Sequence, residues 1–205
     1  MESHKLVIKF FLDDPAAVAD SAFVPVFHSL IQTHAIPDHL LIDVADYQHV
    51  PDGPGVVLVS HEANFYLDHN VGRRLGLMYQ RKQPFPGAET FRDRLAQVCA
   101  ATLRTAVRLE DERAFDGRLK FRADQAVFRI NDRLLAPNTR ETFEQVAPDL
   151  RQFVLDVYGP SAGDVALDHK PSPLTLFEVG IKASRPVDVR ALLERITPLV
   201  PSLTP

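Results

Sequence analysis

Apolar residues follow two spacings along the chain, and together they predict a mixture of strands and helices. Short stretches rich in Val, Ile, Leu and Phe and bounded by Pro, Gly or Asp are typical of strands. Longer stretches with apolar residues every three or four positions are typical of helices packed on a core. We expect strands over 6–12, 40–47, 56–67, 75–83, 165–167 and 174–183, and either two short strands or one bulged strand over 118–122 and 126–131. We expect helices over 21–34, 88–112, 139–158 and 188–196, the third capped by Asn138.

The predicted strands come in adjacent groups and do not alternate strictly with helices. This order favours an α+β fold, a mainly antiparallel sheet packed by three to four helices in a two-layer sandwich. The 205 residues suit one large domain, which we expect to span 1–196. The Pro-rich segment 197–205 is predicted to be a flexible tail.

Composition narrows the class of protein. The hydrophobic share of 45% and the charged share of 24% are those of an ordinary globular protein. A net charge of -4 gives no general attraction to nucleic acid or to an anionic membrane, so we expect neither as a partner. The single cysteine, Cys99, permits no internal disulfide, which indicates a reducing, cytoplasmic location. Its apolar neighbours on the second helix predict a core residue, not a nucleophile.

Motifs for common chemistries are missing from the chain. There is no phosphate-binding P-loop, no dinucleotide-binding glycine pattern and no nucleophile elbow around Ser60. No cofactor is therefore predicted. The sequence favours a non-catalytic protein that binds a partner protein or a small ligand, and the exposed edges of its sheet make a homodimer reasonable.

Histidines are concentrated in one part of the chain. Six of the eight lie between positions 28 and 69, with acidic residues among them. Imidazole and carboxylate groups together can hold a divalent metal or act as general acid and base. The candidate metal ligands are Asp46, His49 and His61, and the candidate catalytic pair is His61 with Glu62.

Two interpretations of this histidine-rich region remain open. The first is a small metal-assisted or acid–base hydrolase centred on His61. The second is a single buried His61 with a hydrogen-bond partner, because alternate residues of a strand would place His61 on the apolar side of 56–67. Adjacent strand residues face opposite ways, so His61 and Glu62 could share one ion only at a bulge.

Basic residues on or near the central strands form a second candidate site. Arg81 and Arg129 could hold a small anionic ligand, because guanidinium groups match carboxylate and phosphate. Asn131 and Arg133 could add a ligand-facing loop beside them. The alternative is structural: surface ion pairs for the arginines, and a brace for the following helix from the loop.

Overall fold

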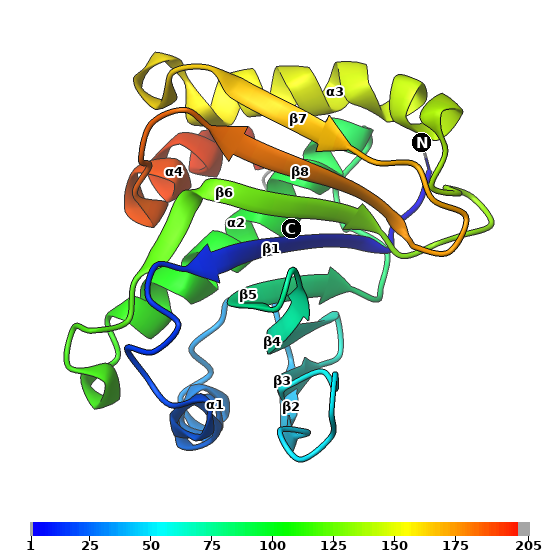
Figure 1. The fold of residues 1–205 in the computed structure, drawn as a ribbon. Coiled ribbons are helices and arrows are strands. Elements are labelled where there is room, and N and C mark those ends of the chain that lie inside the picture. The colour runs from blue at the N-terminus through cyan, green and yellow to red at the C-terminus, as the bar shows by residue number, and fades with distance from the viewer. Residues whose placement is uncertain (1, 201–205) are drawn as a thin grey trace.

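Every strand of the sheet runs antiparallel to its neighbours within residues 2–200, which the computed structural model describes. The order across the sheet is β2-β3-β4-β5-β1-β6-β8-β7 (Figure 1). The strands are β1 (Leu6–Leu12), β2 (Leu41–Asp46), β3 (Val56–Ser60), β4 (Ala63–Val71), β5 (Arg74–Arg81), β6 (Phe121–Ile130), β7 (Val165–His169) and β8 (Phe177–Ala183). The helices are α1 (Phe23–Gln32), α2 (Phe91–Glu110), α3 (Arg140–Tyr158) and α4 (Val189–Ile196). The predicted α+β class is confirmed.

The helices pack on one face of the sheet and leave the other face open. Helices α2, α3 and α4 lie behind β1, β6, β8 and β7, and α1 packs beside β2 and β3 (Figure 1). On β1, Leu6, Ile8 and Phe10 point into the core between sheet and helices. Lys9 and Phe11 point to the opposite face and are also buried, because β1 lies in the middle of the sheet.

Local side-chain chemistry sets the helix starts. Thr90 begins α2 with a capping box, because its hydroxyl accepts from the N–H of Asp93 and the Asp93 carboxylate accepts from the N–H of Thr90. Cys99, in the middle of α2, is buried, and burial raises the pKa of its thiol, which confirms a core residue. Helix α3 is capped by Thr139, so the predicted Asn138 cap is wrong. The amide of Asn138 donates instead to the Thr175 hydroxyl.

The structure overturns one strand prediction and decides between the two alternatives for another. The single strand predicted over 56–67 is wrong: β3 ends at Ser60 and β4 begins at Ala63. The Ser60 hydroxyl accepts from the N–H of Ala63 and donates to its carbonyl, which closes a tight turn. The bulged alternative for 118–131 is confirmed as β6, whose pairing with β1 shifts register between Phe10 and Phe11.

The first residues of the predicted C-terminal tail are ordered in the structure. Residues 197–199 of the predicted flexible tail form a 3₁₀ turn after α4, and 201–205 lie outside the described residues. No helix in the described part of the chain has both the length and the apolar character needed to cross a membrane.

Candidate anion-binding site

A cavity of about 560 Å³ lies at one end of β5, between the segment that precedes β2 and helix α2. We call it the Arg81 cavity. Its wall is formed by Asp38 and His39 before β2, by Glu62 in the β3–β4 turn, by Tyr79 and Arg81 of β5, by Gln97 and Arg104 of α2, and by Thr197 and Val200 after α4. Segments distant in the sequence therefore bring polar side chains to one enclosed space.

A chain of hydrogen bonds fixes the protons of three of these side chains. His39 Nδ1 lies 2.8 Å from the Pro37 carbonyl oxygen, which can only accept, so Nδ1 carries the hydrogen. His39 Nε2 lies 3.0 Å from the Tyr79 hydroxyl and accepts its hydrogen. The same hydroxyl accepts from Arg81 Nη1 at 3.3 Å. With His39 and Tyr79 both neutral, each of these three hydrogen bonds therefore has one donor and one acceptor.

Burial keeps both groups neutral. Loss of solvent lowers the pKa of His39, and the nearby positive charge of Arg81 acts in the same direction. Loss of solvent likewise raises the pKa of Tyr79, against the opposing effect of Arg81. The positive charge on this side of the cavity is therefore that of the guanidinium.

Arg81 is buried without a carboxylate partner. Only 7% of the residue is exposed, and it forms no ion pair with any described residue. Its Nε and Nη2 donate to the carbonyls of Gln83 and Pro84 at 2.8 and 2.7 Å, and its guanidinium lies 4.9 Å from the centre of the Phe85 ring. Burial of a charge is costly unless the charge is compensated. Neutral oxygens hold this cation in place but do not neutralise it.

A second cation and two carboxylates complete the wall. Arg104 is half-buried and makes no hydrogen bond or ion pair with the described part of the chain. Asp38 is exposed, and Glu62 is half-buried with Oε2 accepting from the N–H of Leu40 at 2.8 Å. Partial burial would raise the pKa of Glu62, but this hydrogen bond and one from its own backbone N–H outweigh it and lower the pKa. Glu62 is therefore ionised at neutral pH.

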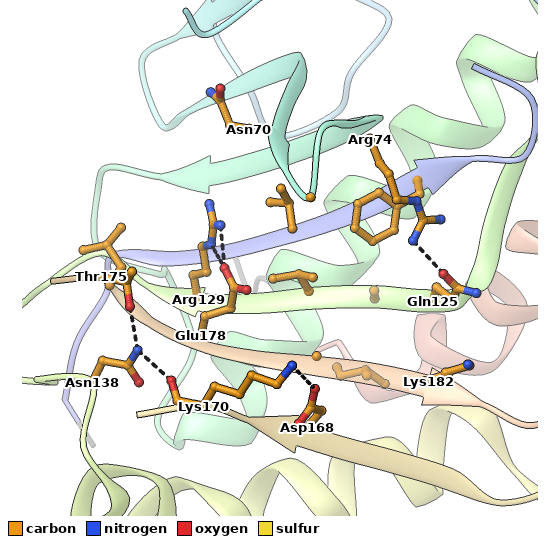
Figure 2. A pocket seen from close by; sticks show the side chains of 18 of the residues that line it. Asn70, Arg74, Gln125, Arg129, Asn138, Asp168, Lys170, Thr175, Glu178 and Lys182 are labelled. Carbon is orange, nitrogen blue, oxygen red and sulfur yellow. Dashed lines mark hydrogen bonds and ion pairs between the residues drawn. The ribbon is translucent and has the colours of Figure 1, made fainter. Parts of the chain in front are cut away.

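A larger cavity, of about 960 Å³, lies on the helix-free face of the sheet. We call it the sheet trough. Figure 2 shows most of its labelled polar side chains in contact with one another, with Asn70 and Lys182 as exceptions. Arg129 Nη2 lies 2.5 Å from a Glu178 carboxylate oxygen, and Arg74 donates to Gln125 at 2.7 Å. The trough is larger than the Arg81 cavity, but these arginines have partners within the protein.

The structure separates the predicted metal ligands. Asp46 pairs with Val56 at one end of the β2–β3 ladder, and Leu41 pairs with Ser60 at the other. His49 follows Asp46, whereas His61 follows Ser60, so the three predicted ligands are not brought together. Among residues 2–200, no group of three or more His, Cys, Asp or Glu side chains could hold a metal ion.

The predicted catalytic pair is also divided. His61 is exposed in the β3–β4 turn and does not line the Arg81 cavity, so the interpretation of a buried His61 is wrong. The apolar neighbours of His61 in sequence suggested burial only because one continuous strand was expected there. Glu62, the next residue, does line the cavity.

The predicted anion-binding residues lie in different places. Arg81 lines the cavity that bears its name, and Arg129 lines the sheet trough. Arg133 is exposed and donates to the Leu174 carbonyl at 2.8 Å, and the N–H of Asn131 donates to the Lys5 carbonyl. These contacts within the protein agree with the alternative interpretation, in which the 131–133 loop has a structural role and does not face a ligand.

Sequence reasoning missed most of the wall, including His39, Tyr79 and Arg104. Tyr79 and Arg81 are two positions apart on a strand and so share a face, a signal that could have joined them. His39 was one of the concentrated histidines, but its partner Tyr79 is 40 residues away. Arg104 lies off the apolar stripe of α2, and no local pattern distinguishes it from a solvated arginine.

Comparison with known proteins assigns no family: no family model, no curated protein and no solved structure matches the chain. The geometry and charge of the cavity are therefore the basis for a functional proposal.

Proposed function

We propose that this protein binds a small anionic ligand, a carboxylate or a phosphate, in the Arg81 cavity, and that it acts as a non-catalytic binding protein. The observation that carries the proposal is the buried Arg81 guanidinium, which has no acidic partner among the described residues. A bound anion would supply the missing charge, and Arg104 of α2, which lines the same cavity, would provide a second cationic contact.

The size and lining of the cavity support a small molecule. A volume of about 560 Å³ falls within the usual range for ligand sites, about 300–1,000 Å³. Glu62 and Asp38 also line this space, so a bare anion would meet some repulsion there. A ligand that also carries a hydroxyl or amine suits the wall best, because the Glu62 carboxylate can accept its hydrogen.

Binding is favoured over catalysis by the state of the candidate acid and base. The hydrogens of His39 and Tyr79 are both used within the wall, where they orient Arg81. The alternative, an acid–base hydrolase centred on His61, draws less support because His61 lies outside the cavity.

The test is thermal unfolding at constant ionic strength with increasing inorganic phosphate, citrate or, as a reference anion, chloride. A ligand that binds only the folded state raises the Tm. We expect a rise with phosphate or citrate, and whichever is stronger identifies the anion class. Loss of the charge-assisted contact in Arg81→Met or Arg104→Met should weaken the response about 10- to 100-fold.

Arg108→Met and Arg129→Met are the matched controls. Arg108 lies one turn beyond Arg104 on α2 and pairs with Glu112, and Arg129 pairs with Glu178 in the trough. Both controls should respond like the parent protein. Equal responses from all four variants, or no response of the parent protein to either anion, would remove the proposal.

A further inference from the structure

The two edges of the sheet differ in how well they are protected against another strand. Edge strands carry unpaired N–H and C=O groups that can pair with a second chain unless something covers them. Strand β2 forms one edge and β7 forms the other, the uppermost strand of the sheet in Figure 1. The chemistry of each edge shows which of them can accept a partner.

The β2 edge is protected by carboxylates. The N–H of Tyr47 donates inward to Gly55, so the N–H of Val44, an odd number of residues away, points outward. The Asp43 carboxylate accepts from that outward N–H at 2.8 Å. The pairing of β2 with β3 is also irregular between Leu41 and Asp43. An incoming strand would have to displace a charged side chain and match a distorted edge.

The β7 edge has no such cover. The N–H of Ser184 donates to the Asp164 carbonyl, so even-numbered residues of β7 pair with β8 and odd-numbered residues point outward. No described residue accepts from the outward N–H groups of Val165, Leu167 and His169. Their side chains are half-buried, and a further strand would cover them.

We propose that a second copy of this chain pairs with this edge, β7 against β7, antiparallel and with the two Leu167 residues directly opposite. A two-fold axis through Leu167 places Lys170 of each copy opposite Asp164 of the other. Both side chains are exposed, and both lie on the open face of the sheet, as Ala166 and Asp168 do. Directly opposite residues on one face approach to about 5 Å, close enough for two symmetry-related ion pairs.

Charge excludes the neighbouring two-fold registers. An axis through Ala166 would place Asp164 of one copy opposite Asp168 of the other. An axis through Asp168 would place that carboxylate opposite its own copy. Like charges directly opposite destabilise strand pairing. Lys170 at present lies 3.7 Å from Asp168 of its own strand (Figure 2), both largely exposed, so it can turn to a partner at little cost.

A charge-exchange experiment on the full chain tests this register. Analytical ultracentrifugation of the parent protein should show a monomer–dimer equilibrium. Lys170→Glu should raise the dissociation constant about tenfold or more, because it places two carboxylates opposite each other at both ends of the pairing. The double variant with Asp164→Lys and Lys170→Glu should restore the parent value, since the ion pairs re-form with exchanged sides.

Two further results decide the proposal. Ile42→Lys on the β2 edge is the matched control, and it should leave the dissociation constant unchanged. A parent protein that stays monomeric, or a dimer that is indifferent to both charge variants, would overturn β7 pairing. Asp164, Lys170 and Ile42 are all exposed, so their substitution should not disturb the core. Circular dichroism should therefore show the same fold for every variant.

Discussion

Two buried cations on opposite faces of the sheet, Lys9 and Arg81, differ in their partners. Lys9 on β1 is fully buried, with Nζ 2.5 Å from an Asp68 carboxylate oxygen and 2.8 Å from the Asp68 carbonyl. Arg81 on β5 is also buried, but only neutral oxygens contact it. The charge of Lys9 is compensated by a carboxylate within the fold, whereas no described residue forms an ion pair with Arg81.

This contrast is the basis on which we propose a binding role for Arg81 and a structural role for Lys9. The Lys9–Asp68 pair joins β1 to β4 across the intervening β5, and nothing in it is open to a ligand. Arg81 lines a cavity, and its orientation is set by Tyr79 and by two backbone carbonyls. A buried arginine without an acid is therefore a better guide to a binding site than a count of charged residues.

The largest expected effect comes from breaking the compensated pair. Lys9→Met leaves the Asp68 carboxylate buried without a cation, and we expect a loss of about 3–5 kcal/mol in the free energy of unfolding. Urea unfolding measures it. The folded variant should still respond to phosphate or citrate as the parent protein does, because Lys9 points to the opposite face of the sheet and does not line the Arg81 cavity.

The double variant with Lys9→Met and Asp68→Asn serves as the control. It should recover part of the lost stability, because neither residue of the former pair then carries a buried charge. A single variant that loses less than about 1 kcal/mol would place the pair among weak surface ion pairs and contradict its structural role.

A smaller effect is expected from the tyrosine that orients Arg81. Tyr79→Phe leaves His39 Nε2 and one Arg81 N–H without a partner. We therefore expect the free energy of unfolding to fall by about 1–2 kcal/mol, and the rise in Tm with phosphate or citrate to be smaller. Tyr158→Phe is the matched control, because its buried hydroxyl donates to the Ala123 carbonyl in the core. If both variants keep the full anion response, Tyr79 does not position Arg81.

The smallest effect concerns pH. Burial lowers the pKa of His39 in the folded protein, so the unfolded chain takes up its proton first as the pH falls through about 6.5. This residue therefore makes the protein less stable below that pH. His39→Gln should flatten the fall in Tm between about pH 7.5 and 5.5.

His169 provides a comparison on the other side of the molecule. Burial also lowers its pKa, so His169→Gln should reduce the same fall without any change in the anion response. An unchanged pH dependence in His39→Gln would mean that the pKa of His39 is not lowered in the folded protein, and would contradict the neutral imidazole inferred for the cavity wall.

The fold was predicted better than the site because helices and sheets depend on local spacing. The α+β class, four helices and the hairpin around Gly72 follow from apolar periodicity and turn residues. The error over 56–67 arose because the Ser60 turn uses a side-chain hydroxyl and carries no Gly or Pro.

The site required knowledge of which distant segments meet. Glu62 and Arg81 were named from the sequence, but for separate reasons, and only the fold places them in one cavity. His39 comes from the segment before β2, Tyr79 from β5 and Arg104 from α2. Charge and residue type alone could not distinguish Arg81, which lacks an acidic partner, from Arg129, which has one.

Gly76 has a consequence for how the chain folds. A Cβ atom there would lie 2.8 Å from Lys9 Cε and 2.4 Å from the Phe10 carbonyl oxygen, so the lysine stem crosses β5 only at a residue without a side chain. If β5 slipped by one residue during assembly, Leu75 or Leu77 would occupy the crossing point and the ion pair could not close. One glycine thus favours the native register of the central strands over registers shifted by one residue.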